Sequence, residues 1–362
     1  MAAKSIFDKP FDDGTKAKLT IFESYLEKWL PVFVSRQEII WQNIKIFDFF
    51  SGMGKDENGT LGSPLRTIKI VNSFCNYIKT KNLKVRLVFN ELNTDYYEAL
   101  KVNVGEAIKE CNYEIVLANN SFNELFEAEY PSMANSANFI FLDQNGIKEI
   151  TGSIFKKIIA LKQTDFLFFI SSSFFKRFAN TKEFKNYFPF DQKDIAETDY
   201  YHIHRKVLQH YKSIIPNGTT YYLAPFSIKK NTNIYGLVFG TPHTFGIEKF
   251  LSVAWKIDPL TGEANYDIDN ENISTSSPFL FDEMNKPTKR QVFEGSLENK
   301  ILSKIYRNNL DVYYSTLEDG FLLKDANTVL KNLKDAKKID FDFKLITERL
   351  HKSKSPEPIK VL

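Results

Sequence analysis

Short apolar runs alternate with polar segments along the first half of the chain, and each run is about as long as one β-strand. Runs of this kind are typical of strands buried on both faces of a parallel sheet. The stretches between them repeat apolar residues at the spacing of helices that pack on a sheet. Strands that alternate with helices predict a doubly wound α/β sheet. The five predicted strands are 45–50, 84–89, 113–118, 137–142 and 165–171.

Two further strands, 220–228 and 234–241, are separated by a short polar turn and predict a β-hairpin. Five parallel strands that end in a hairpin are typical of a class I methyltransferase sheet, whereas a plain nicotinamide-binding Rossmann domain lacks the hairpin. The predicted fold class is therefore α/β, with a Rossmann-like class I methyltransferase sheet and an antiparallel C-terminal hairpin. Residues 45–258 would form this domain.

Residues 1–44 would form an N-terminal helical segment that packs on this core. Within it, Thr15–Pro31 predicts an amphipathic helix, because its apolar residues recur on one face. The helix would pack across the sheet or over the ligand. Its lysines Lys16 and Lys18 would face a ligand or nucleic acid, or belong to a solvated face.

The C-terminal part has a different pattern. Residues 259–290 are rich in polar residues, glycine and proline and predict a linker or long loop. Residues 291–350 predict three short helices and a small strand, which is typical of a winged helix-turn-helix-like domain. Residues 351–362 predict a disordered tail. Candidate nucleic-acid contacts are Lys324, Asn327, Lys331 and Lys334, although winged-helix folds also dock proteins.

Composition excludes several classes of protein. The formal net charge of +3 is too small to require a polyanionic partner. Two cysteines exclude a disulfide scaffold and a four-cysteine zinc site, and they fit a reducing cytoplasm. His202 and His204 lack a third ligand at a defined spacing, so no metal site is predicted. No apolar stretch approaches the ~20 residues of a membrane-spanning helix.

The most informative stretch is the apolar run 45–50, which carries Asp48 and leads into a glycine loop. Glycines allow a sharp turn and a close approach of the backbone to a ligand. Ser63-Pro64 then predicts a helix start, whose free N–H groups attract a carboxylate or a phosphate. Strand, loop and helix form the first unit of a Rossmann-like nucleotide site. Its predicted ligand contacts are Asp48, Ser51, Gly52, Gly54 and Ser63.

The ends of the next two strands add candidates to this site. Glu91 follows the second strand, where a Rossmann-type site places its acceptor for the ribose hydroxyls. Asn120, Ser121 and Phe122 follow the third strand and would bracket a purine, or form a helix cap with a core phenylalanine. There is no phosphate-binding loop of the G-x-x-x-x-G-K-[ST] type and no G-x-S-x-G elbow, which disfavours an ATPase and a hydrolase.

Several of these stretches together resemble the three-Cys-motif partner protein family, TcmP, a bacterial family of methyltransferase-like proteins. The resemblance implies a fold that binds S-adenosylmethionine. It also implies a partner, a phage-type protein with a three-cysteine motif. The residues that carry the resemblance are 15–19, 25–31, 47–54, 62–65, 141–143 followed by Gly146, 235–241, and the helix with Gly246, Lys249 and 255–256.

The loop after the fourth strand decides whether such a protein is active. Asp143, Gln144 and Asn145 are the candidate catalytic or substrate-orienting residues. Gln144 replaces the proline that the family tends to carry there. Amino-methylating DNA enzymes place an acceptor oxygen and an aromatic ring at this point, and Asp143 keeps the oxygen. Cytosine-C5 methylation would need a cysteine nucleophile, which this loop lacks.

Two functions remain open. The first is an S-adenosylmethionine-dependent methyltransferase that acts on nucleic acid, DNA or RNA, or on a modified base. The second is a non-catalytic partner or regulatory protein of the same fold that binds DNA or another protein. The Asp48, Gly52, Gly54 and Glu91 set favours the first, and Gln144 favours the second. The expected location is the cytoplasm, away from membranes.

Overall fold

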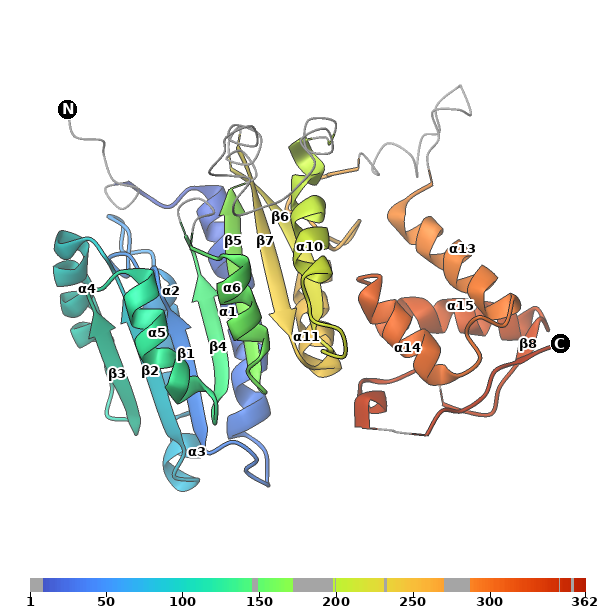
Figure 1. The fold of residues 1–362 in the computed structure, drawn as a ribbon, viewed down its shortest axis with the longest axis horizontal. Helices are drawn as coiled ribbons and strands as arrows, with labels where there is room; N and C mark the ends of the chain where they lie inside the picture. The colour runs from blue at the N-terminus through green and yellow to red at the C-terminus, as the bar shows by residue number, and fades with distance from the viewer. Residues whose placement is uncertain are drawn as a thin grey trace. The chain divides into compact units, whose positions relative to one another are not determined.

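The computed structural model describes residues 9–144, 149–171, 198, 200–230, 233–269, 287–344, 346–352 and 355–362. The chain divides into two compact units (Figure 1). The first contains residues 1–221 and 225–242. The second contains residues 222–224 and 243–362. The predicted domain boundaries differ in detail from this division. Residues 172–197 and 199, between the fifth predicted strand and the predicted hairpin, lie outside the described residues.

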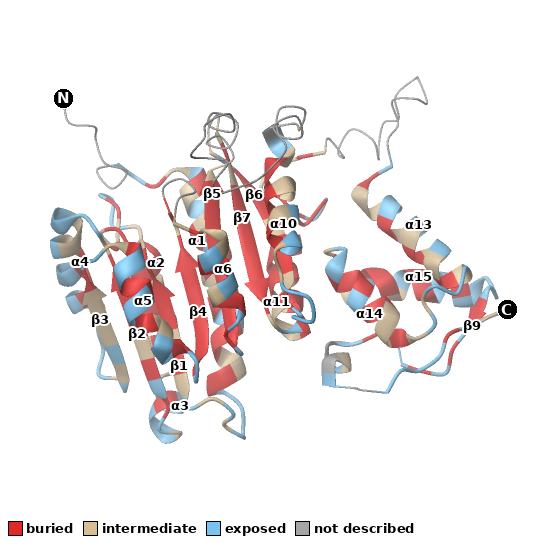
Figure 2. Cartoon of the chain, in the orientation of Figure 1, coloured by how far each residue is buried: buried red, intermediate tan, exposed pale blue. Residues whose placement is uncertain are grey.

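The first unit is built on a seven-stranded sheet of order β3-β2-β1-β4-β5-β7-β6. Neighbouring strands among the first five run parallel, and β7 runs antiparallel to β5. The predicted Rossmann-like fold with an antiparallel end is therefore confirmed. The central strands are almost wholly buried (Figure 2), as their unbroken apolar runs predict. The strands are β1 (Asn43–Asp48), β2 (Lys84–Asn90), β3 (Tyr113–Ala118), β4 (Ala137–Leu142), β5 (Thr164–Ser171), β6 (Tyr222–Lys230) and β7 (Asn233–Thr241).

Helices cover the sheet, and α5 and α6 lie in front of it in Figure 1. The segment that follows the predicted helix start at Ser63-Pro64 forms two helices, α2 and α3, which are divided at Phe74. The helices are α1 (Asp13–Val34), α2 (Ser63–Ser73), α3 (Cys75–Thr80), α4 (Thr94–Ala107), α5 (Phe122–Met133), α6 (Gly152–Ile159) and α10 (Ile203–Ser213), with a 3-10 turn η1 (Tyr200–His202) before α10.

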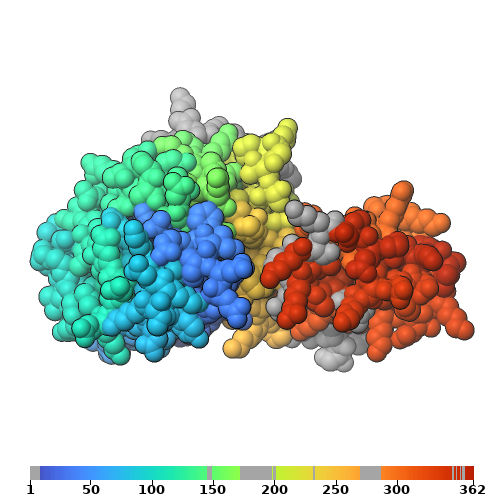
Figure 3. Space-filling view, turned by 90° about the horizontal axis from the view of Figure 1, so that it is seen from below, coloured from blue at the N-terminus to red at the C-terminus, as the bar shows by residue number. Residues whose placement is uncertain are grey.

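The N-terminal helix α1 packs on the sheet through aromatic rings. Phe22 lies 4.5 Å from Phe141 between ring centroids, and Trp29 lies 5.5 Å from Phe139. An ion pair between Glu23 of α1 and Arg66 joins this helix to α2. In Figure 3 the blue surface of the N-terminal part adjoins the lighter blue surface of the segment after β1. The predicted packing of this helix across the sheet is confirmed.

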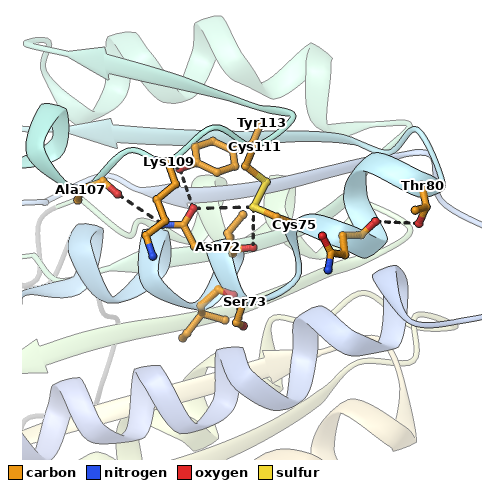
Figure 4. The surroundings of a disulfide bond; sticks show 11 residues. Asn72, Ser73, Cys75, Thr80, Ala107, Lys109, Cys111 and Tyr113 are labelled. Atoms are coloured by element: carbon orange, nitrogen blue, oxygen red, sulfur yellow. Dashed lines mark hydrogen bonds between the residues drawn. A yellow bond between two sulfur atoms is a disulfide. The ribbon is translucent and has the colours of Figure 1, made fainter.

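Cys75 and Cys111 form a disulfide, with their Cα atoms 5.5 Å apart (Figure 4). The bond joins the start of α3 to the segment that leads into β3. Tyr113 donates a hydrogen bond to the side chain of Asn72 at 3.0 Å beside it. The expectation of two reduced cysteines is therefore not met. The sequence count alone could not place two side chains 36 positions apart within bonding distance.

The second unit holds α11 (Thr244–Ile257) and a compact helical group. Phe293 and Phe321 stack at 4.0 Å in its core. The two short strands pair with each other in antiparallel fashion. The other elements are α13 (Lys289–Leu302), α14 (Asn309–Glu318), α15 (Leu323–Asp335), β8 (Ile339–Asp340), η3 (Glu348–Lys352) and β9 (Lys360–Val361).

The prediction of a disordered tail is wrong for residues 355–362. Val361 pairs with Ile339, and the N–H of Ile359 donates to the carbonyl of Arg307 at 2.8 Å. The side chain of Ile359 is 8% exposed, so it adds to the core of this unit. The pairing partner is the predicted strand near Lys338, far from the tail in sequence, which local composition does not reveal. None of the described helices is long and apolar enough to cross a membrane.

Candidate functional site

The carboxyl ends of β1 and β4 lie side by side, with Asp48 opposite Phe141 in the register of the two strands. The chain order reverses at this pair, because β2 and β3 follow on one side of β1 and β4 and β5 lie on the other. In open α/β sheets such a switch point is where ligands bind, outside the carboxyl ends of the strands. Asp48 and Asp143 stand on the two sides of it.

The loop after β1 folds back on itself through its glycines. Gly52 and Gly54 have φ values of +61° and +87°, which side chains rarely allow. The N–H of Gly62 donates to the carbonyl of Gly54 at 2.7 Å, and a Cβ atom on Gly62 would lie 2.9 Å from that oxygen. The loop therefore needs glycine at Gly52 and Gly54 for their positive φ values, and at Gly62 for the close approach to Gly54. These glycines bring the start of α2 close to Asp48.

Helix α2 begins without a side-chain cap. Gly62 is the N-cap, and Ser63 is the first helical residue, so the predicted helix start at Ser63-Pro64 is confirmed. Because Gly62 has no side chain to cap the first N–H groups, these donors remain available to an anionic group. Ser63 is buried and its hydroxyl favours the charged form of Asp48.

Asp48 is the most unusual side chain of the site. It is 1% exposed, and its Oδ2 atom is buried without a hydrogen bond. Its Oδ1 atom accepts only a long bond of 3.3 Å from the N–H of Phe50. Burial raises the pKa of Asp48 to about 7, and the charge of Asp143 acts in the same direction. The nearby Ser63 and Lys18 oppose this rise, but Ser63 makes no well-formed hydrogen bond to Oδ2. A buried carboxylate without a partner is costly unless a ligand supplies one.

Ser51 and Asn90 hold this loop against the sheet. The hydroxyl of Ser51 donates to the carbonyl of Asp48 at 3.0 Å, and its N–H donates to the carbonyl of Asn90 at 2.8 Å. The buried amide of Asn90 donates to the carbonyls of Phe49 and Asn120 and accepts from the N–H of Asn120. Sequence reasoning missed Asn90. An amide at the tip of a buried strand was the available signal.

Glu91 reaches back to the glycine loop. Its Oε2 atom accepts from the N–H of Gly52 at 2.9 Å, and its Oε1 atom accepts from the N–H of Asn93 at 2.8 Å. The carboxylate is thus fixed beside the loop. Each of its oxygens has further lone-pair capacity for a hydroxyl donor. The structure brings Glu91 and Gly52 together across 39 positions of sequence.

The residues after β3 take up helix-capping and core positions. Ser121 caps α5 and forms a capping box with Glu124. Phe122 is 4% exposed and packs against the rings of Phe49 and Phe50, at 5.2 and 5.6 Å. Asn120 is bonded to Asn90 through its backbone. This is the second of the two arrangements that the sequence left open, and a role of these residues in binding a purine stays a prediction.

Asp143 forms an ion pair with Lys18, which lies on α1, 125 positions earlier in the sequence. The ammonium of Lys18 also lies 5.1 Å from the centre of the Phe169 ring. Gln144 is 6% exposed and spans two backbone groups. Its amide donates to the carbonyl of Phe169 at 3.2 Å and accepts from the N–H of Glu149 at 3.1 Å. Gln144 therefore supports the loop. Asn145 and Gly146 lie outside the described residues.

The four residues predicted to contact nucleic acid lie on α15, but they differ in whether hydrogen bonds hold their side chains. Lys324 and Lys331 are exposed. Asn327 exchanges two hydrogen bonds of 2.9 Å with the backbone of Ile346. Lys334 donates to the carbonyl of Phe341 at 2.6 Å and pairs with Asp340 at 3.2 Å. The last two side chains thus fasten α15 to the segment that follows it.

Comparison with known proteins agrees with a separate winged-helix domain in the C-terminal part of the chain. Residues 266–344 match the model of the GMT-like wHTH domain. The predicted winged helix-turn-helix domain is therefore confirmed. None of the curated proteins matches the sequence.

Among solved structures, a candidate methylase from Haemophilus influenzae is 9% identical, with a TM-score of 0.28, over 60% of this chain and 86% of that chain. A candidate methyltransferase from Escherichia coli is 12% identical, with a TM-score of 0.28, over 64% of this chain and 90% of its own. A Rossmann-superfamily protein from Streptococcus agalactiae is 12% identical, with a TM-score of 0.29, over 90% and 100% of the two chains. The strand order, and not these distant similarities, identifies the methyltransferase-like fold.

Proposed function

We propose that this protein binds S-adenosylmethionine at the β1–β4 switch point and is a methyltransferase that acts on nucleic acid or on a modified base. The observation that carries the proposal is the buried Oδ2 atom of Asp48, which makes no hydrogen bond and lies beside a glycine loop and an uncapped helix start. A carboxylate in that position calls for a cationic or hydrogen-bonding ligand group.

The residues present fit this ligand. Asp48 would accept from the methionine amine, and the first N–H groups of α2 would receive the methionine carboxylate. Glu91, fixed by Gly52, would accept from the ribose hydroxyls. When bound, the sulfonium group supplies an already activated methyl group. The protein then needs only to position the acceptor and to take up its proton. The carboxylate of Asp143, just after β4, would supply the oxygen that takes up this proton.

Isothermal titration calorimetry with S-adenosylmethionine tests the proposal. We expect binding by the wild type and at least a tenfold weaker affinity for Asp48→Asn and for Glu91→Gln. Asp95→Asn, an exposed position in the first turn of α4, serves as a control and should bind as the wild type does. NAD⁺ should not compete. Absence of heat at millimolar S-adenosylmethionine would overturn the proposal.

A non-catalytic role in the same fold is the second candidate, and the state of the β4 loop favours it. Gln144 is committed to two backbone bonds, and Asp143 is already paired with Lys18. A protein of this kind would bind the ligand without turnover. Equal affinity for S-adenosylmethionine and S-adenosylhomocysteine, with no methyl transfer to DNA or RNA, would select this alternative.

The winged helix would bind the nucleic acid, with Lys324 and Lys331 as the free phosphate contacts of α15. Fluorescence anisotropy with duplex DNA should show weaker binding for the Lys324→Ala/Lys331→Ala variant and a salt dependence reduced by about two charges. Lys109→Ala/Lys162→Ala removes the same charge from exposed positions of the first unit and should leave both quantities unchanged. Identical salt slopes for the two variants would contradict this role.

The resemblance to the TcmP family supports two further parts of the proposal. We propose a three-Cys-motif protein as the partner, in a bacterial cytoplasm. Co-expression followed by size-exclusion chromatography should yield a common peak. Separate elution at micromolar concentration would count against a stable complex.

A further inference from the structure

The side chain of Lys18 is partly buried at the switch point, and its position on the helix alone does not require this. Its side chain is 16% exposed, whereas that of Lys16, two positions earlier on the same helix, is 53% exposed. Lysine is among the residues most rarely buried unless it is paired. The partner of Lys18 is Asp143, which is 125 positions away in sequence.

Two chemically different groups receive the Lys18 ammonium. The carboxylate of Asp143 accepts its hydrogen bond. The ring of Phe169, at 5.1 Å, attracts the cation through its π-electrons. Phe169 is 3% exposed, and its carbonyl is held by Gln144. A carboxylate just after β4 and an aromatic face on β5 together form a receptor for an amine.

The start of α1 holds Lys18 in this place from both sides. Asp12 caps the helix by accepting from Thr15 at 2.8 Å, and Lys230 pairs with Asp12 at 2.9 Å. On the other side, the N–H of Phe11 donates to the buried carboxylate of Asp56 at 2.8 Å. The segment before Lys18 is thus tied to the tip of the β6–β7 hairpin and to the loop after β1.

We propose that Lys18 fills an amine-binding subsite made by Asp143 and Phe169, and that the acceptor of this protein is a primary amine that takes its place. The inference deepens the proposed function, because it names the chemical class of the acceptor and the side chain that must move. A protonated amine has to lose a proton before it can take a methyl group, and the Asp143 carboxylate is the group in contact that can receive it.

The charges around the subsite support this choice of occupant. When Lys18 leaves, Asp143 loses its cation while Asp48 stays nearby without a hydrogen bond at Oδ2. The vacated space then holds carboxylate oxygens and an aromatic ring, which favour a hydrogen-bonding cation over an anion. An incoming amine restores the contacts that Lys18 made.

Truncation of Lys18 followed by addition of free amines tests the proposal. In Lys18→Ala the subsite opens, and n-butylamine should raise the melting temperature Tm by about 2–4 °C at ten times its dissociation constant. The wild type and Lys18→Met, whose long side chain fills the same space, should show no such shift. Lys16→Ala is the control for loss of a lysine from the same helix.

Two further arms separate amine binding from a charge effect. Tetramethylammonium carries the charge but has no N–H donor, and it should stabilise Lys18→Ala clearly less than n-butylamine does. The double variant Lys18→Ala/Asp143→Asn should lose most of the butylamine shift. Lys18→Ser repeats the truncation should Lys18→Ala fail to fold. A truncated protein that does not respond, or that responds equally to tetramethylammonium, overturns the inference and leaves a plain ion pair that docks α1.

The outcome does not depend on the proposed cofactor. Calorimetry of the wild type with S-adenosylhomocysteine tests the proposed cofactor separately from the amine arms. If S-adenosylhomocysteine bound to no form of the protein, that result would overturn the proposed function but not the inferred amine subsite. An amine response would then still establish the subsite.

Discussion

Two aspartates buried in the same sheet have opposite surroundings. Asp165 lies at the start of β5 and is 2% exposed. It accepts hydrogen bonds from Tyr25 at 2.5 Å and from Thr241 at 2.7 Å. Asp48 lies at the end of β1 and is 1% exposed, with its Oδ2 atom unbonded. Burial raises the pKa of both carboxyls, to about 6 for Asp165 and about 7 for Asp48.

The difference shows how a structural carboxylate differs from a candidate ligand-binding one. The fold supplies partners to Asp165 from α1 and β7, so its burial joins three elements. The fold leaves Asp48 short of partners at the edge where ligands enter an α/β sheet. Proteins keep such an unsatisfied group chiefly where it has a function. Of four predictions, ordered from the largest expected effect to the smallest, the first separates stability from ligand binding, and the other three test the contrast between Asp165 and Asp48.

Loss of the disulfide should lower stability without changing the ligand site. A bond between Cys75 and Cys111 closes a loop of about 36 residues, and Cys75→Ser/Cys111→Ser should lower the free energy of unfolding by about 4 kcal/mol. Urea denaturation of the oxidised wild type and of the variant measures the difference. At temperatures where both are folded, their affinity for S-adenosylmethionine should be equal. A parallel fall in affinity would show that stability and binding cannot be separated here.

Removal of the Asp165 carboxylate should cost about 3 kcal/mol in the free energy of unfolding. Asp165→Ala removes the carboxylate that accepts hydrogen bonds from Tyr25 and Thr241, and it also creates a cavity. Chemical denaturation provides the measurement. Tyr25→Phe removes one donor only and should cost about 1 kcal/mol. An Asp165→Ala protein as stable as the wild type would mean that this carboxylate gives no net support to the sheet.

The same type of change at Asp48 should have the opposite sign. Asp48→Asn removes a buried charge without adequate partners and should raise the free energy of unfolding at pH 8 by about 2 kcal/mol. Its affinity for S-adenosylmethionine should fall, as proposed above. Thermal denaturation with and without ligand separates the two effects. A destabilised Asp48→Asn would place this residue in the same structural class as Asp165.

Stability should rise as pH is lowered from 8 to 6. Both folded-state pKa values lie above the usual value near 3.9, so the folded protein binds more protons than the unfolded chain in this range. The stability gained from protonation of these two carboxyls is largest at low pH, and it is lost as pH rises through their folded-state pKa values. For Asp48 alone it amounts to about 1 kcal/mol between pH 6 and 8. Melting temperatures of the wild type and Asp48→Asn across this range should differ in slope, and parallel curves would argue against a raised pKa.

Much of the ligand site follows from local pattern. The apolar run that ends at Asp48, the glycines after it and the start of α2 are contiguous, so one segment predicts their arrangement. Glu91 was predictable as well, because it ends the next strand of a parallel sheet. Ser121 and Phe122 show the limit of local pattern, since the same residues fit a purine clamp and a capped helix with a core ring. Packing against Phe49 and Phe50 gave the second arrangement.

The sequence by itself determined the strands, their alternation with helices, the glycine loop and the winged helix, because each depends on the periodicity or turn chemistry of neighbouring residues. Only the tertiary structure decided which side chains meet across long stretches of chain. It paired Lys18 with Asp143, joined Cys75 to Cys111, and ordered the tail by pairing Val361 with Ile339. It also left Asp48 short of partners while Asp165 gained two. Such contacts depend on how elements pack, and the amino-acid pattern of either partner does not contain that information.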